Sequence, residues 1–276
     1  MKDEGGSKHM SRIVGYSSRL RKSWFSWTGP ESVFFFTFHK CASTLFSSYI
    51  LRNIKGLERV DYASQIYDNR RSTDRELTFR KKGYVYGPIR LSANPEGPVH
   101  KLLVTPTTEP GFVRDKIAIF FIRDPRDILV SAYYSFGYTH GLSQVRDIQG
   151  QQQARRKSTQ SISLDEYVLV NADSQVKNFE KMIELTRVCK RGVILKYEDM
   201  IDNFESFREK FCRDIVVDDD VMREIHKRSR PIEGENAESH RRSGKVGGFK
   251  EKLSEETLQA LNGHLENILT KLDYPL

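Results

Sequence analysis

Short apolar segments, none longer than a β-strand, recur along an otherwise polar chain. Residues 32–38 (SVFFFTF) and 116–122 (KIAIFFI) are almost continuously aromatic or aliphatic, which predicts strands buried on both faces. Residues 83–91, 100–104 and 192–197 predict three further strands. Continuous apolar character, rather than alternation, is typical of parallel sheets, because helices cover both faces of such sheets.

Helical periodicity follows several of these strands. The predicted helices begin at Ser43 and span residues 125–138, 164–189, 204–215 and 254–272. Asp124 is the expected N-cap of the helix at 125, with Pro125 at the first helical position, and Ser254 is the expected cap of the last helix. Strands that alternate with helices indicate an α/β fold, a single domain with a central parallel sheet flanked by helices.

Three other segments show no regular period. Residues 56–82 are rich in charge and predict irregular structure or a short helix. Residues 144–161 are polar and low in complexity, which predicts a mobile loop, and residues 228–250 predict a loop or an ordered arm. Residues 1–10 predict a disordered N-terminus, so the expected domain spans residues 11–276.

The composition restricts the cellular compartments and the classes of ligand to be considered. The three cysteines show no CxxC spacing, which disfavours a disulfide framework or a zinc site. No apolar run approaches the roughly 20 residues of a membrane span, and MKDEGGSKHM lacks the apolar core of a signal peptide. We therefore expect a cytoplasmic protein without integral membrane association. The net charge of +8 favours an anionic ligand: a nucleotide, a membrane surface, a nucleic acid or an acidic substrate.

The turn after the first strand has the composition of an anion site. It reads His39-Lys40-Cys41-Ala42-Ser43-Thr44 and lies between a buried strand and a helix. Backbone N–H groups at such a turn point in one direction, and Lys40 adds a full positive charge. The segment is not a Walker A loop, because GxxxxGK[ST] occurs nowhere in the chain. An ordinary capped helix start explains the turn about as well.

A second candidate follows the strand at 116–122. Arg123 comes where that strand ends, and Ser131 lies two turns into the next helix. Ligands of α/β sheets collect beyond the carboxyl ends of the strands, where an arginine can hold a phosphate through two hydrogen bonds. The alternative is structural, with Arg123 and Arg126 paired to neighbouring Asp124 and Asp127.

The third candidate is the basic, glycine-rich stretch from Arg241 to Lys250. It contains Arg242, Ser243 and Gly244, followed by Gly247-Gly248-Phe249. Glycine permits the backbone angles with which N–H groups wrap an anion. A flexible basic loop is the alternative interpretation.

These three segments, in this order, resemble the sulfotransferases that use 3'-phosphoadenosine-5'-phosphosulfate (PAPS). The resemblance covers most of residues 32–250 and includes Tyr197-Glu198-Asp199-Met200, a stretch whose Tyr approaches the nucleotide in that family. It implies a P-loop-like nucleotide-binding core, no metal, and PAPS bound by a set of residues matching the motifs: Lys40, Cys41, Ala42, Ser43, Thr44, Leu45, Arg123, Ser131, Tyr197, Arg242, Ser243 and Gly244. The product would be adenosine 3',5'-bisphosphate (PAP).

Five positions depart from the family pattern. His39 stands where the family usually has Pro, and Cys41-Ala42 replaces a Ser-Gly type pair. Leu45 stands where many members place a Trp against the adenine, and Ser243 replaces a frequent Lys.

The resemblance also implies catalytic roles. Lys40 would stabilise the leaving phosphate, and a His between the two phosphate motifs would act as general base. His100 matches that His in position, while Glu109 and His140 are alternatives. The acceptor would be a small molecule with a hydroxyl or an amine. Its pocket could be lined by aromatic side chains that could equally pack in the core: Trp24, Trp27, Tyr133, Tyr134, Phe136 and Tyr138.

Three other functions compete with this one. A P-loop-type phosphotransferase would share the sheet but should carry a Walker A loop. A nucleic-acid-binding module would suit the charge, although no RNP, KH or zinc-finger signature occurs in the sequence. An inactive sulfotransferase fold is the third, given the substitutions at Cys41 and Leu45. The oligomeric state is not predicted.

Overall fold

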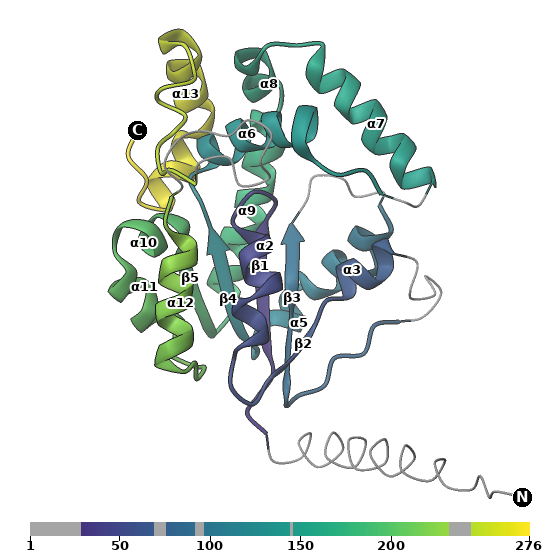
Figure 1. The fold of residues 1–276 in the computed structure, drawn as a ribbon, viewed down its shortest axis with the longest axis vertical. Helices are drawn as coiled ribbons and strands as arrows, with labels where there is room; N and C mark the ends of the chain where they lie inside the picture. Colours follow the sequence, from purple (N-terminus) through teal and green to yellow (C-terminus); the bar gives the residue numbers. More distant parts are fainter. Residues whose placement is uncertain (1–28, 69–75, 92–96, 144–145, 232–243) are drawn as a thin grey trace, which may run out of the picture.

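A computed structural model describes residues 29–68, 76–91, 97–143, 146–231 and 244–276. Five strands form one sheet: β1 (Val33–Phe38), β2 (Glu58–Val60), β3 (Tyr84–Leu91), β4 (Ile117–Ile122) and β5 (Arg191–Lys196). Their order is β2-β3-β1-β4-β5, and every neighbouring pair is parallel (Figure 1). The predicted α/β fold with a central parallel sheet is therefore confirmed.

The two strands that were clearest in the sequence lie at the centre of the sheet. All six residues of β1 and all six of β4 are buried. β5, at one edge, has a single buried residue, Leu195, and β2, at the other edge, has only three residues. A central strand is covered on both faces and must be apolar throughout, whereas an edge strand is under weaker constraint.

Helices cover both faces of the sheet. They are α2 (Ser43–Ser48), α3 (Tyr62–Tyr67), α4 (Thr105–Thr107), α5 (Pro110–Val113), α6 (Pro125–Tyr134), α7 (Arg146–Gln160), α8 (Leu164–Val170), α9 (Ala172–Val188), α10 (Tyr197–Asp202), α11 (Phe204–Phe211), α12 (Asp219–Ser229) and α13 (Glu255–Lys271). A 3-10 turn η1 (Ile50–Arg52) and two π-helical turns, η2 (His100–Val104) and η3 (Ser135–Thr139), complete the described elements.

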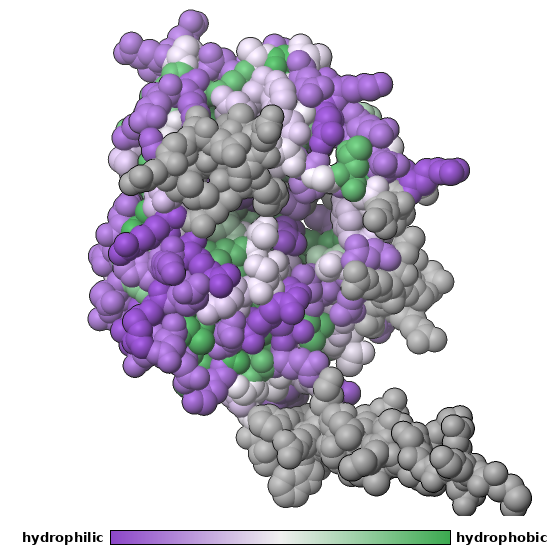
Figure 2. Space-filling model, viewed as in Figure 1, coloured by the Kyte–Doolittle hydropathy of each residue, from purple (hydrophilic) through white to green (hydrophobic). Residues whose placement is uncertain are grey.

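Alternate side chains of β1 fix these helices to opposite faces. The ring of Phe35 lies 4.4 Å from that of Phe46 on α2, and the ring of Phe38 lies 4.3 Å from that of Phe179 on α9. Odd and even residues of a strand point to opposite sides, so α2 and α9 sandwich the sheet, as Figure 1 shows. On the face shown in Figure 2, hydrophilic side chains predominate. None of the described helices is long and apolar enough to cross a bilayer.

Two helix caps agree with the sequence. The side chain of Asp124 accepts a hydrogen bond from the backbone N–H of Arg126, and Ser254 accepts one from the N–H of Thr257. Pro125 occupies the first position of α6. Because both caps are local, their signal in the sequence was sufficient.

Other expectations were wrong. Residues 144–161 were expected to form a mobile loop, but residues 146–160 form helix α7. Residues 100–104 form the π-helical turn η2 rather than a strand, since a short apolar run fits either structure. The helix expected at 164–189 breaks at Asn171 into α8 and α9. The sequence analysis also missed strand β2. The expected domain boundary and the N-terminal prediction for residues 1–10 fall outside the described residues.

Candidate functional site

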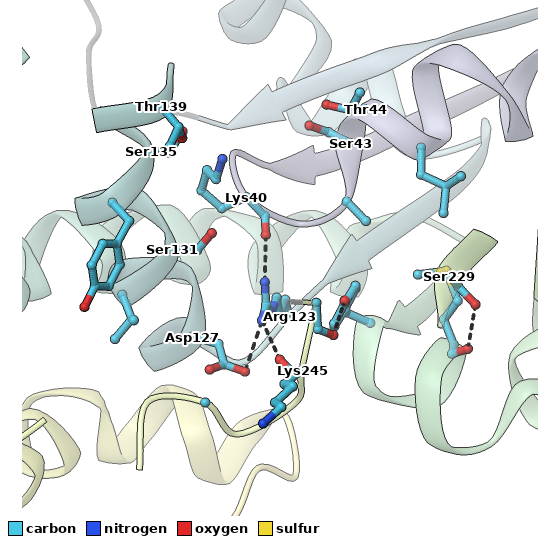
Figure 3. A pocket seen from close by; sticks show the side chains of 18 of the residues that line it. Lys40, Ser43, Thr44, Arg123, Asp127, Ser131, Ser135, Thr139, Ser229 and Lys245 are labelled. Carbon is cyan, nitrogen blue, oxygen red and sulfur yellow. Dashed lines mark hydrogen bonds and ion pairs between the residues drawn. The ribbon is translucent and has the colours of Figure 1, made fainter. Parts of the chain in front are cut away.

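A cavity of about 350 Å³ opens beyond the carboxyl ends of β1 and β4. It is walled by the turn after β1 and α2, by α6 and η3, by α10 and α12, and by residues 244–252 (Figure 3). Of the predicted binding residues, those that line it are Lys40, Ala42, Ser43, Thr44, Leu45, Arg123, Ser131, Tyr197 and Gly244. Arg242 and Ser243 lie outside the described residues. The structure thus brings together segments that are far apart in the sequence.

The turn after β1 adopts an unusual backbone. Lys40 has φ +69° and Ala42 has φ +47°, the left-handed region that side chains disfavour. Such strain, of about 1–3 kcal/mol per residue, persists only where the surroundings impose it and is concentrated at functional sites. Ala42 precedes α2 without a side-chain cap, so the first N–H groups of the helix receive no acceptor from that side chain.

Cys41 is buried beneath the turn and does not line the cavity. Burial, above all, raises the pKa of its thiol to about 12, although Arg123 acts in the opposite direction. The side chain is therefore a neutral packing group at physiological pH, and any contribution to ligand binding would come from its backbone.

Arg123 joins three walls of the cavity. Its guanidinium lies 3.3 Å from the carboxylate of Asp127 and donates to the carbonyl oxygens of Lys40 (3.3 Å) and Lys245 (3.0 Å) (Figure 3). It also packs over the ring of Tyr197, with Cζ 4.5 Å from the ring centre. Burial alone would lower the pKa of Arg123, but Asp127 raises it above its ordinary value. The buried Nε makes no hydrogen bond within the described residues.

Arg126 points elsewhere and lines no part of the cavity. It is 1% exposed and donates to both carboxylate oxygens of Asp124 (3.0 and 2.7 Å), to Asn262 (2.8 Å) and to the carbonyl of Pro275 (2.6 Å). Its guanidinium also packs on Phe249, with Cζ 4.2 Å from the ring centre. The structural pairing considered for the two arginines therefore exists for both. For Arg126 it is the whole environment, whereas Arg123 also faces the cavity.

The described part of the glycine-rich stretch is tied to the same place. Asp127 accepts hydrogen bonds from the backbone N–H groups of Gly247 (2.9 Å) and Phe249 (3.1 Å). The hydroxyl of Tyr197 donates to the carbonyl of Gly244 at 2.6 Å. Gly244 and Gly247 have φ of +70° and +71°, angles that glycine adopts without strain. Residues 244–249 are thus an anchored arm and not a freely flexible loop.

Hydroxyl groups line the wall made by α6 and η3. Ser131, Ser135 and Thr139 follow one another at four-residue intervals along one side (Figure 3), as residues of a helical face do. The buried Oγ of Ser135 has no hydrogen-bond partner within the described residues. Of these three residues, only Ser131 was predicted from the sequence.

None of the three predicted bases lines the cavity. His100 lies in η2, where its Nδ1 is 3.2 Å from the hydroxyl of Thr105, and burial lowers its pKa. Glu109 precedes α5. His140 directly follows Thr139, and its ring centre lies 5.9 Å from that of Phe136. Their catalytic roles stay predictions.

His39 was not among the functional groups predicted from the sequence. Burial, followed by the neighbouring cations with Arg90 first, lowers the pKa of His39 to about 3. His39 is exposed, so solvent screens the charges around it. The imidazole is neutral at physiological pH and is adjacent in sequence to Lys40.

The aromatic residues considered for an acceptor pocket occupy different environments in the structure. Tyr134 lines the cavity, whereas Tyr133 is buried and packs against Tyr167 with ring centres 5.4 Å apart. Tyr138 is half exposed. Trp24 and Trp27 fall outside the described residues. Within the described parts of the chain, no group of three or more His, Cys, Asp or Glu is arranged to hold a metal ion.

Comparison with known proteins identifies the fold. No protein-family model matches the chain, and no curated protein matches its sequence. Mouse sulfotransferase SULT7A1, solved in complex with PAP, superposes with a TM-score of 0.53 at 14% identity, over 93% of this chain and 90% of that one. Retinol dehydratase, solved with retinol and PAP, gives a TM-score of 0.46 at 12% identity, over 90% of this chain and 83% of that one. The chain therefore has a sulfotransferase-like α/β fold, as its sequence motifs implied.

Proposed function

We propose that this chain is a PAPS-dependent sulfotransferase, which transfers a sulfuryl group to a hydroxyl or an amine of a small molecule. The observation that carries the proposal is the convergence of three distant segments on one cavity. Lys40 with its turn, Arg123 with Ser131, and the arm that begins at Gly244 all line it. Each segment alone has an ordinary structural explanation, but such explanations do not require the three to share a cavity.

The polar groups of the cavity suit a bisphosphorylated nucleoside. Arg123 retains a buried Nε without a partner, and Ser135 retains a buried hydroxyl without one, within the described residues. Buried donors left unsatisfied cost about 1–3 kcal/mol each, and phosphate oxygens would satisfy them. We assign the 3'-phosphate to Arg123 and Ser131, and the 5'-phosphosulfate to the turn around Lys40.

Sulfuryl transfer is an in-line displacement, in which the acceptor attacks sulfur opposite the phosphate that leaves. The bond between sulfur and the bridging oxygen breaks as the bond to the acceptor forms, and negative charge grows on the departing phosphate. Lys40 neutralises that charge. A base removes the acceptor proton, and His100, Glu109 and His140 are the candidates from the sequence. His39 joins them because its imidazole is neutral and follows directly on the strand that carries the turn.

The decisive experiment is thermal denaturation with PAP and, as a matched control, with adenosine 5'-monophosphate, which lacks the 3'-phosphate. PAP should raise the melting temperature strongly and the monophosphate weakly, because at a given concentration the stabilisation by a ligand increases with the logarithm of its affinity. An acceptor screen with labelled PAPS should then detect transfer that persists in EDTA. No stabilisation by PAP would refute the proposal.

The competing functions give different results in the same experiments. A phosphotransferase would be stabilised by ATP with magnesium in preference to PAP and would lose activity in EDTA. A nucleic-acid-binding module would show a salt-sensitive gel shift without a response to PAP. An inactive sulfotransferase fold would bind PAP but transfer no sulfuryl group to any acceptor.

A further inference from the structure

A second group of basic side chains gathers outside the cavity lining, next to Lys40. It comprises His39, His140 and Arg155, which lie around the ring of Phe136, together with Arg90, whose charge acts on His39, and is called the basic cluster below. The ring of Phe136 lies 3.4 Å from the guanidinium carbon of Arg155, and its centre lies 6.4 Å from that of His39 and 5.9 Å from that of His140. The cluster draws on the turn after β1, the end of β3, the segment around η3, and α7.

Arg90 is fastened to the turn that carries Lys40. Its Nε donates to the hydroxyl of Ser43 at 3.1 Å. The carboxylate that acts on it most strongly is that of Asp61, but this group already accepts from Arg59 (2.9 Å) and from the N–H of Ser64 (3.0 Å). Burial lowers the pKa of Arg90, which indicates that its charge is incompletely solvated.

Arg155 reaches the cluster from helix α7. Its guanidinium covers the face of Phe136 in a cation–π contact and also lies close to the hydroxyl of Tyr167. Within the described residues, no carboxylate lies within ion-pair distance of Arg155 or of Arg90. Arg155 thus lies on the aromatic ring and Arg90 lies against the turn, and neither forms an ion pair among the described residues.

The charges of the cluster and of Lys40 all act on His39. After burial, the groups that lower the pKa of His39 are Arg90, Arg155, Lys40 and His140, in that order. Like charges held close together raise the free energy of the folded protein, and an anion bound among them lowers it. The arrangement is therefore typical of an anion-binding site.

The position of the basic cluster indicates which anion it would bind. Lys40 lines the nucleotide cavity and also acts on His39, so it lies on the boundary between the cavity and the cluster. In Figure 3 its side chain extends toward Ser135 and Thr139, on the segment that continues to His140. In-line transfer requires the acceptor to approach sulfur from the side away from the nucleotide.

We propose that the basic cluster binds an anionic group of the sulfuryl acceptor, a carboxylate or a sulfate or phosphate ester, through the guanidinium groups of Arg90 and Arg155. Guanidinium matches such groups with paired hydrogen bonds, and Phe136 offers an apolar surface to the rest of the acceptor. This inference rests on the proposed function, because it takes the cluster to be the acceptor side of a PAPS site.

The test uses hydroxyl-bearing probes in acid and neutral pairs, with the full chain saturated by PAP. The pairs are 4-hydroxyphenylacetate with its methyl ester, and glucose 6-sulfate and glucose 6-phosphate with glucose. Calorimetry should show at least one acid binding about tenfold more tightly than its neutral partner. Arg155→Gln should abolish that preference. Lys157→Gln removes the same charge from α7 at a position with no described contact to the cluster, and it should preserve the preference.

Measuring the affinity for PAP distinguishes a failure of the proposed function from a failure of this inference. Wild-type protein that does not bind PAP refutes the proposed function. Protein that binds PAP but binds no acid in preference to its neutral partner overturns the inference and leaves the proposed function standing. An acid preference that Arg155→Gln and Arg90→Gln both leave intact, in variants that still bind PAP, also overturns it.

Discussion

Arg123 and Arg126 are three residues apart, yet the structure gives them opposite tasks, and substituting each by Met should separate those tasks. Arg126 is enclosed and makes four hydrogen bonds, two of them to Asp124. Arg123 faces the cavity and retains an unpartnered Nε. We therefore expect Arg126→Met to lose mainly stability and Arg123→Met to lose mainly nucleotide affinity.

The magnitudes follow from what each substitution leaves behind. Without Arg126, the buried carboxylate of Asp124 has no counter-ion, which costs about 3–5 kcal/mol. At about 2–4 °C per kcal/mol for a chain of this size, the melting temperature should fall by about 6–20 °C. Without Arg123, Asp127 still accepts hydrogen bonds from two backbone N–H groups. The free energy of unfolding should therefore fall by less, about 1–3 kcal/mol.

Nucleotide affinity should show the reverse order. Truncating a buried group that binds a phosphate costs about 2 kcal/mol or more, so Arg123→Met should weaken PAP binding by at least about 30-fold. Arg126→Met should stay within about threefold of wild type, measured by calorimetry below the melting transition of the variant. Arg126→Lys, which keeps the charge but not the planar fork, should recover only part of the stability. Equal stability losses in the two Met variants, or equal losses of PAP affinity, would refute this division.

Three other predictions concern the turn, the arm and the sheet. Lys40→Ala should lower kcat by about 10²–10³-fold while PAP affinity falls by less than about tenfold; near-normal turnover would exclude Lys40 from the transfer step. Tyr197→Phe deletes the 2.6 Å bond to Gly244 and should weaken PAP binding by about five- to tenfold in calorimetry, whereas unchanged affinity would mean that the arm is held by other contacts. Gly87→Ala should destabilise by about 2–4 kcal/mol in urea unfolding, since φ is +149° and a Cβ would lie 2.8 Å from a carbonyl oxygen of β1. The control, Gly263→Ala on an exposed turn of α13, meets nothing within 4 Å and should stabilise by about 0.5–1 kcal/mol; the opposite ranking would contradict the steric argument.

The elements predicted correctly from the sequence are those whose conformation is determined by their burial or by residues close in sequence. β1 and β4 are central, so every position is apolar, and the caps of α6 and α13 lie within a few residues of the N–H groups that they satisfy. Strand β2 has three partly exposed residues and takes its conformation from pairing with β3. That pairing joins segments distant in sequence and leaves no periodic signal.

Helix α7 shows why a polar segment can be misjudged. It carries too few apolar residues to predict a packed helix. Its contacts are instead made by polar side chains: Arg155 covers Phe136, and Gln160 donates to the carbonyl of Gly137 at 2.8 Å. Arginine and glutamine can pack through their stems while their ends make hydrogen bonds, so hydropathy alone underestimates such an interface.

At the candidate site, the motifs correctly predicted the segments at the strand ends but not the other side chains that surround them. Ser131 was found through the resemblance, while Ser135, one helical turn further, was missed because its role depends on the course of η3. His39 was noted only as a departure from the family pattern, since nothing in the sequence says that Arg90 and Arg155 converge on it. Contacts of this kind depend on the tertiary fold and become visible only in three dimensions.

Arg123 explains why the predicted motifs act as one unit. Two of its nitrogens donate to backbone carbonyls, one in the turn that carries Lys40 and one in the arm at Lys245. Its ion pair with Asp127 in turn fixes the residue that accepts from Gly247. The side chain expected to bind phosphate is thus the one that positions the other two phosphate-binding segments. A ligand that engages the remaining Nε would therefore strengthen the arrangement on which its own binding depends, which couples nucleotide affinity to the order of the turn and the arm.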